Sequence, residues 1–312
     1  MYKFKYMIFF LKILVSATLL IFVANNVDFS KIFELLKNFE TSSILITIAV
    51  LVIQIFIANI RWMILLNVFN YRLTYIQLLQ YFWIGIFFNQ MLPSSIGGDA
   101  ARIYYLRKSS GNIKSATLGV FLDRIFGIAG LSFLAWSALF FLPSTLDDSI
   151  IQSGIIISFG VFGLVSVLFV LDYLPFNLPN WKIIRGLNSL SLSARNAILS
   201  RNFGLVLIIL SISIHLLSVI VFIALSEGMM LNINWLDMLL IIPLIILFTL
   251  IPISFAGWGL REGAMIVGMG YLNVQLEQAL ALSILYGLLV LVTSIPGGLF
   301  WLFNHKINIK SV

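Results

Sequence analysis

Two short polar segments interrupt the apolar stretches of this chain, and each combines helix-breaking residues with an arginine. The first reads LPSSIGGDAAR (92–102) and the second reads IPISFAGWGLR (251–261). They are identical at four positions with a constant offset: Pro93 and Pro252, Ser95 and Ser254, Gly98 and Gly257, Arg102 and Arg261. With one residue of slippage, LDRIFG (122–127) also aligns with LSILYG (282–287). These matches predict an internal repeat.

The residue types indicate an anion site built from broken helices. Proline stops a helix, glycine permits close backbone approach, and serine is a favoured N-cap. A helix amino end attracts phosphate or carboxylate, and an arginine adds a planar, bidentate donor. We therefore expect half-helices whose amino ends, together with Arg102 and Arg261, contact a phosphate-bearing headgroup. The expected backbone residues are Pro93, Ser95, Gly97, Gly98, Pro252, Ser254, Gly257 and Gly259.

Four further ionisable residues lie in or beside apolar runs, and they are Asp99, Asp123, Arg124 and Glu262. Neighbouring residues on a helix do not face each other, so Asp123 and Arg124 need different partners. The candidates are Arg102 or Arg261 for Asp123, and Asp99, Glu262 or a lipid phosphate for Arg124. Two roles stay open for these residues: headgroup binding, or ion pairs that hold the hairpins together.

The composition is that of a polytopic membrane protein. Of 312 residues, 61% are hydrophobic and 10% are charged, whereas soluble domains have about a quarter of their residues charged. The chain has no cysteine, which excludes thiol chemistry, and its two histidines form no metal-binding motif. His215 lies in an apolar run and is expected to be a packed polar residue. The net charge of +7 is spread over short loops, as membrane topology requires, and indicates no nucleic-acid partner.

The apolar runs predict an all-α membrane protein with about six full spans and two re-entrant hairpins. The expected spans cover residues 6–24, 41–60, 116–142, 150–171, 203–226 and 278–303, since a span needs about 20 apolar residues. Two further runs, 75–92 and 235–251, end at the two polar segments. The first run of the chain lacks a cleavage site and is expected to be retained as a helix. Residues 173–202 are basic and are expected to lie on the membrane surface as an amphipathic connection.

Charge placement predicts the orientation of these spans. With both termini cytoplasmic and each hairpin turning back, 14 of the 19 lysines and arginines fall on the cytoplasmic side, Arg61 and Arg72 among them. The repeat units 75–142 and 235–303 are then inverted relative to one another within one membrane domain. Inverted repeats with broken helices are a recurrent plan of transporters.

The order of these motifs resembles a known family. The segments NQMLPSSIGGDAARIYYL, VFLDRIFG, PISFAGWGLREGA and LALSILYGLLVLVTSIPGGLFWL are similar to the lysylphosphatidylglycerol synthase transmembrane-region family, over about residues 61–303. The resemblance implies a flippase-like membrane domain of the kind found in the bacterial multiple peptide resistance factor. The residues that the resemblance marks are Pro93, Ser95, Gly97, Gly98, Asp99, Arg102, Asp123, Arg124, Gly257, Gly259, Arg261 and Glu262.

One departure from that family leaves the substrate open. The full factor carries a cytosolic aminoacyl-transferase domain, whereas this sequence ends in a short basic tail. We therefore expect no catalytic residue, cofactor or metal, and a lipid partner that is either aminoacylated phosphatidylglycerol, another phospholipid or a polyprenyl-phosphate lipid. The alternatives are a non-catalytic scaffold for a separate synthase, or an integral-membrane enzyme acting on a lipid phosphate or lipid-linked sugar. The expected location is a bacterial or archaeal inner membrane, with homo-oligomers an open option.

Overall fold

A computed structural model describes most of the chain as a bundle of helices. The described residues are 14–18, 21, 27–92, 97–110, 112–141, 148–173, 182–251, 254 and 257–309, and no strand occurs among them. The helices in chain order are α2 (Phe29–Lys37), α3 (Thr41–Asn67), α4 (Tyr75–Met91), α5 (Gly97–Ser110), α6 (Ile113–Ala138), α7 (Asp148–Val170), a 3₁₀ turn (Leu171–Tyr173), α8 (Lys182–Ile198), α9 (Gly204–Gly228), α10 (Trp235–Thr249), α11 (Leu260–Gly270) and α12 (Leu276–Ile309). The all-α membrane class predicted from composition is confirmed.

Five of the described helices are long and apolar enough to cross a membrane. These are α3, α6, α7, α9 and α12, and the shorter α10 is equally apolar. The expected span at 6–24 falls largely outside the described residues, of which 14–18 and 21 are helical. The expected end of the 41–60 span, just before Arg61, is wrong, because α3 continues to Asn67.

Side-chain caps fix where several helices begin. Thr74 accepts a hydrogen bond from the backbone of Gln77, whose side chain in turn accepts from Thr74, so α4 starts with a complete capping box. Asn112 caps α6 by accepting from the backbone amides of Lys114 and Ser115, and Asn234 caps α10 by accepting from the backbone amide of Leu236. Polar loop residues therefore set the boundaries that the continuous apolar runs leave undefined.

The same order of helices occurs twice along the chain. A long helix, a shorter apolar helix, a short helix that carries an arginine and a carboxylate, and a second long helix form α3–α6. The same order of helices forms α9–α12. Their first residues correspond closely, at 41 and 204, 75 and 235, 97 and 260, and 113 and 276. The helix pairs in contact also correspond: α4 packs on α12 as α10 packs on α6, and the short helices α5 and α11 pack on α4 and α10.

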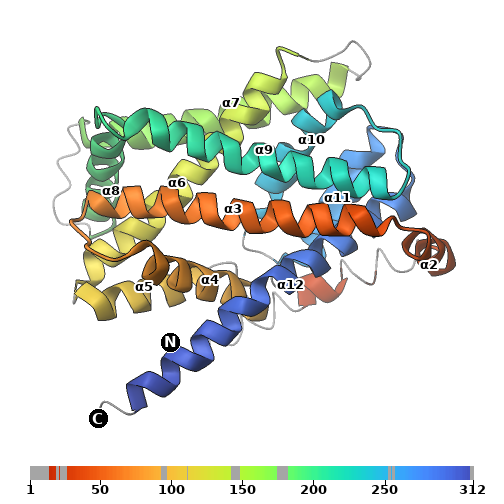
Figure 1. Ribbon diagram of the computed structural model, residues 1–312. Coiled ribbons are helices and arrows are strands. Elements are labelled where there is room, and N and C mark those ends of the chain that lie inside the picture. The colour runs from red at the N-terminus through yellow and green to blue at the C-terminus, as the bar shows by residue number, and fades with distance from the viewer. Residues whose placement is uncertain are drawn as a thin grey trace.

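Helices α3 and α9 lie side by side at the centre and run in opposite directions (Figure 1). At one end the backbone amide of Glu40 donates to the carbonyl of Gly228 over 3.1 Å. Midway, the side-chain amide of Gln54 donates to Ser218 Oγ over 2.6 Å. Towards the other end, Arg61 donates to Ser211 Oγ over 3.4 Å. The first helix of one group is thus antiparallel to the first helix of the other.

The largest buried cluster is formed by apolar residues of α3, α6, α9, α10, α11 and α12. Elsewhere in the bundle, small residues allow helices to cross closely. A Cβ on Gly297 of α12 would lie 2.1 Å from the carbonyl oxygen of Trp83 on α4, whose indole nitrogen donates to the carbonyl of Thr293 over 2.8 Å. By contrast, 11% of the most apolar stretch of α7 is buried, so most of its side chains face away from the bundle.

Candidate functional site

Five charged residues from three helices meet inside the bundle, and we call them the arginine cluster: Arg61, Asp99, Arg102, Asp123 and Arg124. Asp123 of α6 is at the centre. Its Oδ1 accepts from Arg61 Nε at 2.9 Å, and its Oδ2 accepts from an Arg102 guanidinium nitrogen at 2.8 Å. The carboxylate thus joins α3, α5 and α6 through two arginines, and all three side chains are at most 8% exposed.

The second carboxylate of the cluster belongs to Asp99 in the first turn of α5. It accepts a hydrogen bond from Arg124 Nε and lies 4.0 Å from Arg102. Arg124 is the most accessible member, with 30% of its side chain exposed. The pairings of Asp123 with Arg102 and of Arg124 with Asp99 are among the alternatives that the sequence left open. Three guanidinium groups against two carboxylates leave the cluster with an excess of positive charge.

Arg102 is held by aromatic rings as well as by carboxylates. Its guanidinium lies 4.0 Å from the Trp62 ring centroid and 4.5 Å from that of Phe82, within the range of cation–π attraction. Gly85 makes room for the side chain, since a Cβ there would lie 2.8 Å from Arg102 Cγ. Arg102 Nε is buried and has no hydrogen-bond partner among the described residues. Buried donors are nearly always satisfied, so an unpaired guanidinium nitrogen at this depth is unusual.

The arginine cluster lines a cavity of about 470 Å³, which we call the arginine cavity. Asn89, Gly127 and His215 add polar atoms to its wall, and His215 Nε2 is 2.9 Å from the carbonyl oxygen of Gly127. Most of the remaining wall is apolar and comes from Phe82, Ile86, Phe121, Ile125, Ile128, Leu131, Ile246 and Leu250. The cavity therefore offers both a cationic wall and an apolar wall to one occupant.

Arg261 lies in a second, smaller cluster with Glu262, Ser283 and Trp258. Its guanidinium donates to Glu262 Oε1 at 2.7 Å and to Ser283 Oγ at 3.1 Å, and it lies 4.5 Å from the Trp258 ring centroid. The other oxygen of Glu262 accepts from the Gly259 amide at 2.5 Å, at the start of α11. The opposite charges of Arg261 and Glu262 balance within this cluster.

The two arginines occupy equivalent places in the two groups of helices. Arg102 bonds to Asp123 on α6, and Arg261 bonds to Ser283 at the aligned position of α12. A glycine follows at the aligned positions 127 and 287, and a Cβ on Gly287 would lie 2.2 Å from Arg261. The structure nevertheless does not bring Arg102 and Arg261 to one site, because Arg261 and Glu262 are not part of the wall of the arginine cavity.

The polar segments adopt the expected breaks only in part. Gly97 and Gly98 begin α5, and Gly98 packs so closely that a Cβ would lie 2.0 Å from the Gly85 carbonyl oxygen. Pro93, Ser95 and Pro252 lie outside the described residues. The prediction that Ser254 caps the following helix is wrong, since α11 begins at Leu260 with Gly259 as its N-cap. Gly257 and Gly259 have φ of 86° and 87°, a region that favours glycine.

Sequence reasoning missed the role of Arg61. The sequence assigned it only to the cytoplasmic side by charge, whereas the structure shows its side chain buried in the bundle and paired with Asp123. The sequence did contain an indication: the apolar run resumes after it as WMILL, so the helix can continue through Arg61. Trp62, Gly85 and Ser211 were missed as well, and nothing in their local sequence distinguishes them from packing residues.

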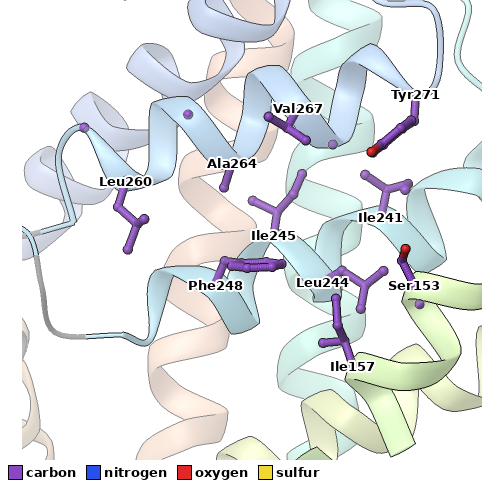
Figure 2. A pocket seen from close by; sticks show the side chains of 14 residues that line it. Ser153, Ile157, Ile241, Leu244, Ile245, Phe248, Leu260, Ala264, Val267 and Tyr271 are labelled. Atoms are coloured by element: carbon purple, nitrogen blue, oxygen red, sulfur yellow. The ribbon is translucent and has the colours of Figure 1, made fainter. Parts of the chain in front are cut away.

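A second cavity in the bundle differs from the arginine cavity in having no charged residue in its lining. It lies between α7, α10 and α11, has a volume of about 420 Å³ and is lined mainly by aliphatic residues (Figure 2). The side-chain oxygens in its lining are the hydroxyls of Ser153 and Tyr271. With no charged residue in its lining, it is poorly suited to recognising a headgroup. The arginine cavity is therefore the candidate site.

Comparison with known proteins identifies the family. Residues 9–297 match the family described as lysylphosphatidylglycerol synthase TM region. The chain belongs to this family. A curated relative, the UPF0104 membrane protein PH1989 of Pyrococcus horikoshii, is 25% identical over 122 residues. That match covers 38% of this chain and 36% of the relative. Membership and the five apolar helices establish a multi-pass membrane protein.

Within the described residues, no group of three histidines, aspartates or glutamates is arranged to hold a metal ion. The carboxylates of the site instead face arginines. Asp123, Asp99 and Glu262 each accept from a guanidinium group, so their oxygens are engaged by cations of the protein itself. Chemically, the site is a set of arginines positioned by carboxylates, an arrangement that suits the binding of a second, exogenous anion.

Proposed function

We propose that this member of the lysylphosphatidylglycerol synthase TM-region family moves a phosphate-bearing lipid between membrane leaflets through the arginine cavity. The observation that carries the proposal is the excess of positive charge in the arginine cluster, whose three guanidinium groups and two carboxylates line the arginine cavity. A charge within a membrane domain is costly unless it pairs, and such residues mark substrate pathways. A lipid phosphate supplies the acceptor and the negative charge.

The mixed wall of the cavity supports a lipid rather than a small soluble anion as the substrate. Arginines on α3, α5 and α6 line one part, and residues such as Ile246 and Leu250 of α10 line another. A phospholipid has the same division into a charged and an apolar part. A lipid phosphate and the Asp123 carboxylate would compete as two anions for the guanidinium of Arg102. The guanidinium therefore stays paired with one anion or the other while the lipid binds.

The repeated helix order supports an inverted-repeat mechanism. We infer that α3–α6 and α9–α12 are inverted repeats, because α3 and α9 are antiparallel and the packed pairs α4–α12 and α10–α6 correspond. The pairs α4–α5 and α10–α11 are then re-entrant hairpins. The end of the bundle that carries α8 is also where α3 and α5 end and α6 begins, near Arg72, Arg107 and Lys114. From this positive charge we infer that this end faces the cytoplasm. Transporters with this plan alternate access by moving one repeat against the other.

The proposal is tested by reconstituting the purified protein in liposomes and measuring leaflet exchange of labelled lipids. The panel contains phosphatidylglycerol, its aminoacylated form, a polyprenyl-phosphate lipid and a neutral glycosyl-diacylglycerol without phosphate. We expect exchange of at least one phosphate-bearing lipid above the rate in protein-free liposomes, and no exchange of the neutral glycolipid. Exchange of none of them, or equal exchange of the neutral lipid, would contradict the proposal.

A further inference from the structure

A third cavity, of about 670 Å³, lies between α6, α7, α8 and α9, and we call it the α8 groove. Four phenylalanines from two helices dominate its lining, namely Phe126 and Phe133 of α6 and Phe162 and Phe169 of α7. Two of them, Phe126 and Phe169, are in edge-to-face contact at 5.8 Å. Its size is within the range of known ligand sites, which are concave and mostly apolar. A hydrocarbon chain matches this lining.

One charged residue, Arg195, belongs to the lining of the α8 groove. We call the end of the groove that it lines the opening, since Arg195 and Tyr173 are partly exposed there. Arg195 of α8 lines it together with Tyr173, and the guanidinium lies 4.0 Å from the Tyr173 ring centroid. Arg195 is also 2.6 Å from Asp172, whose carboxylate accepts a hydrogen bond from Ser191 Oγ at 2.8 Å. These contacts hold the guanidinium at the opening, and 19% of the side chain stays exposed.

Helix α8 adds further positive charge beside the opening. Its sequence, KIIRGLNSLSLSARNAI, contains one lysine, two arginines and no acidic residue. Leu187 and Leu192 are exposed on the same helix, which is the pattern of a helix lying in the membrane interface. Figure 1 shows α8 at the end of the bundle where α9 begins. A basic, amphipathic helix at a membrane surface attracts anionic lipid headgroups.

The α8 groove is separate from the arginine cavity. The wall between them is the contact of α6 with α9, where a Cβ on Gly130 would lie 2.7 Å from Ser211. Gly130 and Ser211 line the α8 groove, whereas Gly127 and His215, one turn away on each helix, line the arginine cavity. The two cavities share no lining residue.

We infer that the α8 groove is a binding site for an anionic phospholipid of the leaflet on the α8 side, with one acyl chain among the four phenylalanines and the phosphate at Arg195. Charge complementarity at the opening and the aromatic lining carry the inference, and it does not depend on lipid transport through the arginine cavity. The cavity between α7, α10 and α11 (Figure 2) has an apolar lining too, but that lining contains no charged residue. Headgroup selectivity therefore distinguishes the α8 groove.

The charge at the opening is tested with a phosphatidylglycerol that carries a photoactivatable diazirine in one acyl chain, and with the matching phosphatidylcholine. Purified full-length protein is irradiated with each, and the labelled residues are mapped by mass spectrometry. We expect phosphatidylglycerol to label the segment 162–170 preferentially. Arg195→Gln should reduce that labelling about fivefold, the change in affinity that one basic residue near a membrane surface supplies.

Asp172→Asn is the matched control for Arg195→Gln, because it removes the same ion pair but keeps the guanidinium. It should retain or increase labelling by phosphatidylglycerol. Equal loss in both variants would mean that the ion pair only holds α8 in place, and it would overturn the inference. Equal labelling of the wild-type protein by the two lipids would overturn it as well, since it would indicate a surface coated by bulk lipid.

The groove itself is tested by filling it. Ser166→Trp places a bulky ring in the lining, whereas Leu164→Trp, on the same helix, changes a side chain that is 73% exposed and is not part of the groove. We expect Ser166→Trp to remove phosphatidylglycerol labelling of 162–170 and Leu164→Trp to leave it. Persisting labelling in a well-folded Ser166→Trp protein would contradict the inference. Leaflet exchange by the same sample reports separately on the arginine cavity.

Discussion

Asp123 is the residue on which the arginine cluster depends, because it is the shared acceptor of Arg61 and Arg102. Each arginine comes from a different helix, so one carboxylate compensates charge and joins α3, α5 and α6. Burying two guanidinium groups without this acceptor would leave like charges facing each other in a medium of low dielectric constant. The cost of removing Asp123 should therefore exceed that of removing either arginine.

Asp123→Asn is expected to lower the free energy of unfolding by about 3–5 kcal/mol, the usual effect of removing one partner from a buried ion pair. Thermal unfolding in detergent, followed by size-exclusion profile, measures it. Glu227→Gln, at the exposed end of α9, is the control and should be almost silent. An unchanged midpoint for Asp123→Asn would show that Arg61 and Arg102 do not need this carboxylate.

The sequence predicted several of these residues but not their whole arrangement. Asp99, Arg102, Asp123 and Arg124 stood out because ionisable residues are costly in an apolar run. Helical spacing showed that Asp123 and Arg124 need different partners, but it left several partners open for each. Arg61 did not stand out, because a charge near the end of an apolar run usually marks the end of the span. Its burial follows from tertiary contacts with α6 and α9, which no local pattern specifies.

At the scale of elements, the site depends on how closely α5 approaches α4. Gly98 lies against the backbone of Gly85, and its amide donates to Asn89 Oδ1 over 2.8 Å. This contact places Asp99 and Arg102, one turn apart on α5, beside the cavity. A hairpin with a wider crossing would carry the same side chains away from Asp123.

Gly98→Ala is expected to destabilise the α4–α5 pair, because the added Cβ would lie 2.0 Å from the Gly85 carbonyl oxygen and 2.6 Å from Asn89. Overpacking of this kind typically costs about 1–3 kcal/mol. The midpoint of thermal unfolding measures the effect. In the matched control Gly263→Ala, on α11, the Cβ meets nothing within 4 Å, so helix propensity should leave stability unchanged or raise it. An equal change of the unfolding midpoint in the two variants would contradict the close approach of α5 to α4.

The existence of the elements was predictable, and their ends were less so. Runs of about 20 apolar residues identified the long helices from length alone. The start of α11 was misplaced because serine is the commoner N-cap, whereas here Gly259 occupies that position and Glu262 accepts from its amide. The end of α3 was misplaced because the charge of Arg61 is compensated by a residue 62 positions away in sequence.

At the scale of the molecule, the repeated helix order and the antiparallel α3–α9 pair support an inverted repeat. The four identities between the two polar segments indicated the repeat, and charge placement indicated its inversion. The sequence match did not include α3 and α9. These two helices share only an apolar composition, which provides no specific residues to align. The inversion stays a prediction until the two ends of the bundle are assigned to the two sides of a membrane.

Single-cysteine labelling can make that assignment, since the native chain has no cysteine. Lys108 at the end of α5 and Gln275 before α12 lie beside the α5–α6 and α11–α12 connections, which correspond in the two groups. Lys108→Cys should be protected from an impermeant thiol reagent applied outside cells, and Gln275→Cys should react. Labelling of both from the same side would exclude an inverted repeat, and reversed labelling would place α8 outside.

The most direct measurement is leaflet exchange of the preferred phosphate-bearing lipid by wild-type protein, Arg102→Ala, Arg102→Lys and Arg72→Ala in matched liposomes. Losing a buried charged contact costs about 2–5 kcal/mol, so Arg102→Ala should lower lipid affinity roughly 30-fold or more. Arg102→Lys should restore exchange only in part, because an ammonium group lacks the planar fork and its stacking on Trp62. Arg72→Ala, exposed in a loop, should exchange normally. Normal exchange by monodisperse Arg102→Ala protein would contradict the claim that the arginine cavity carries the lipid phosphate.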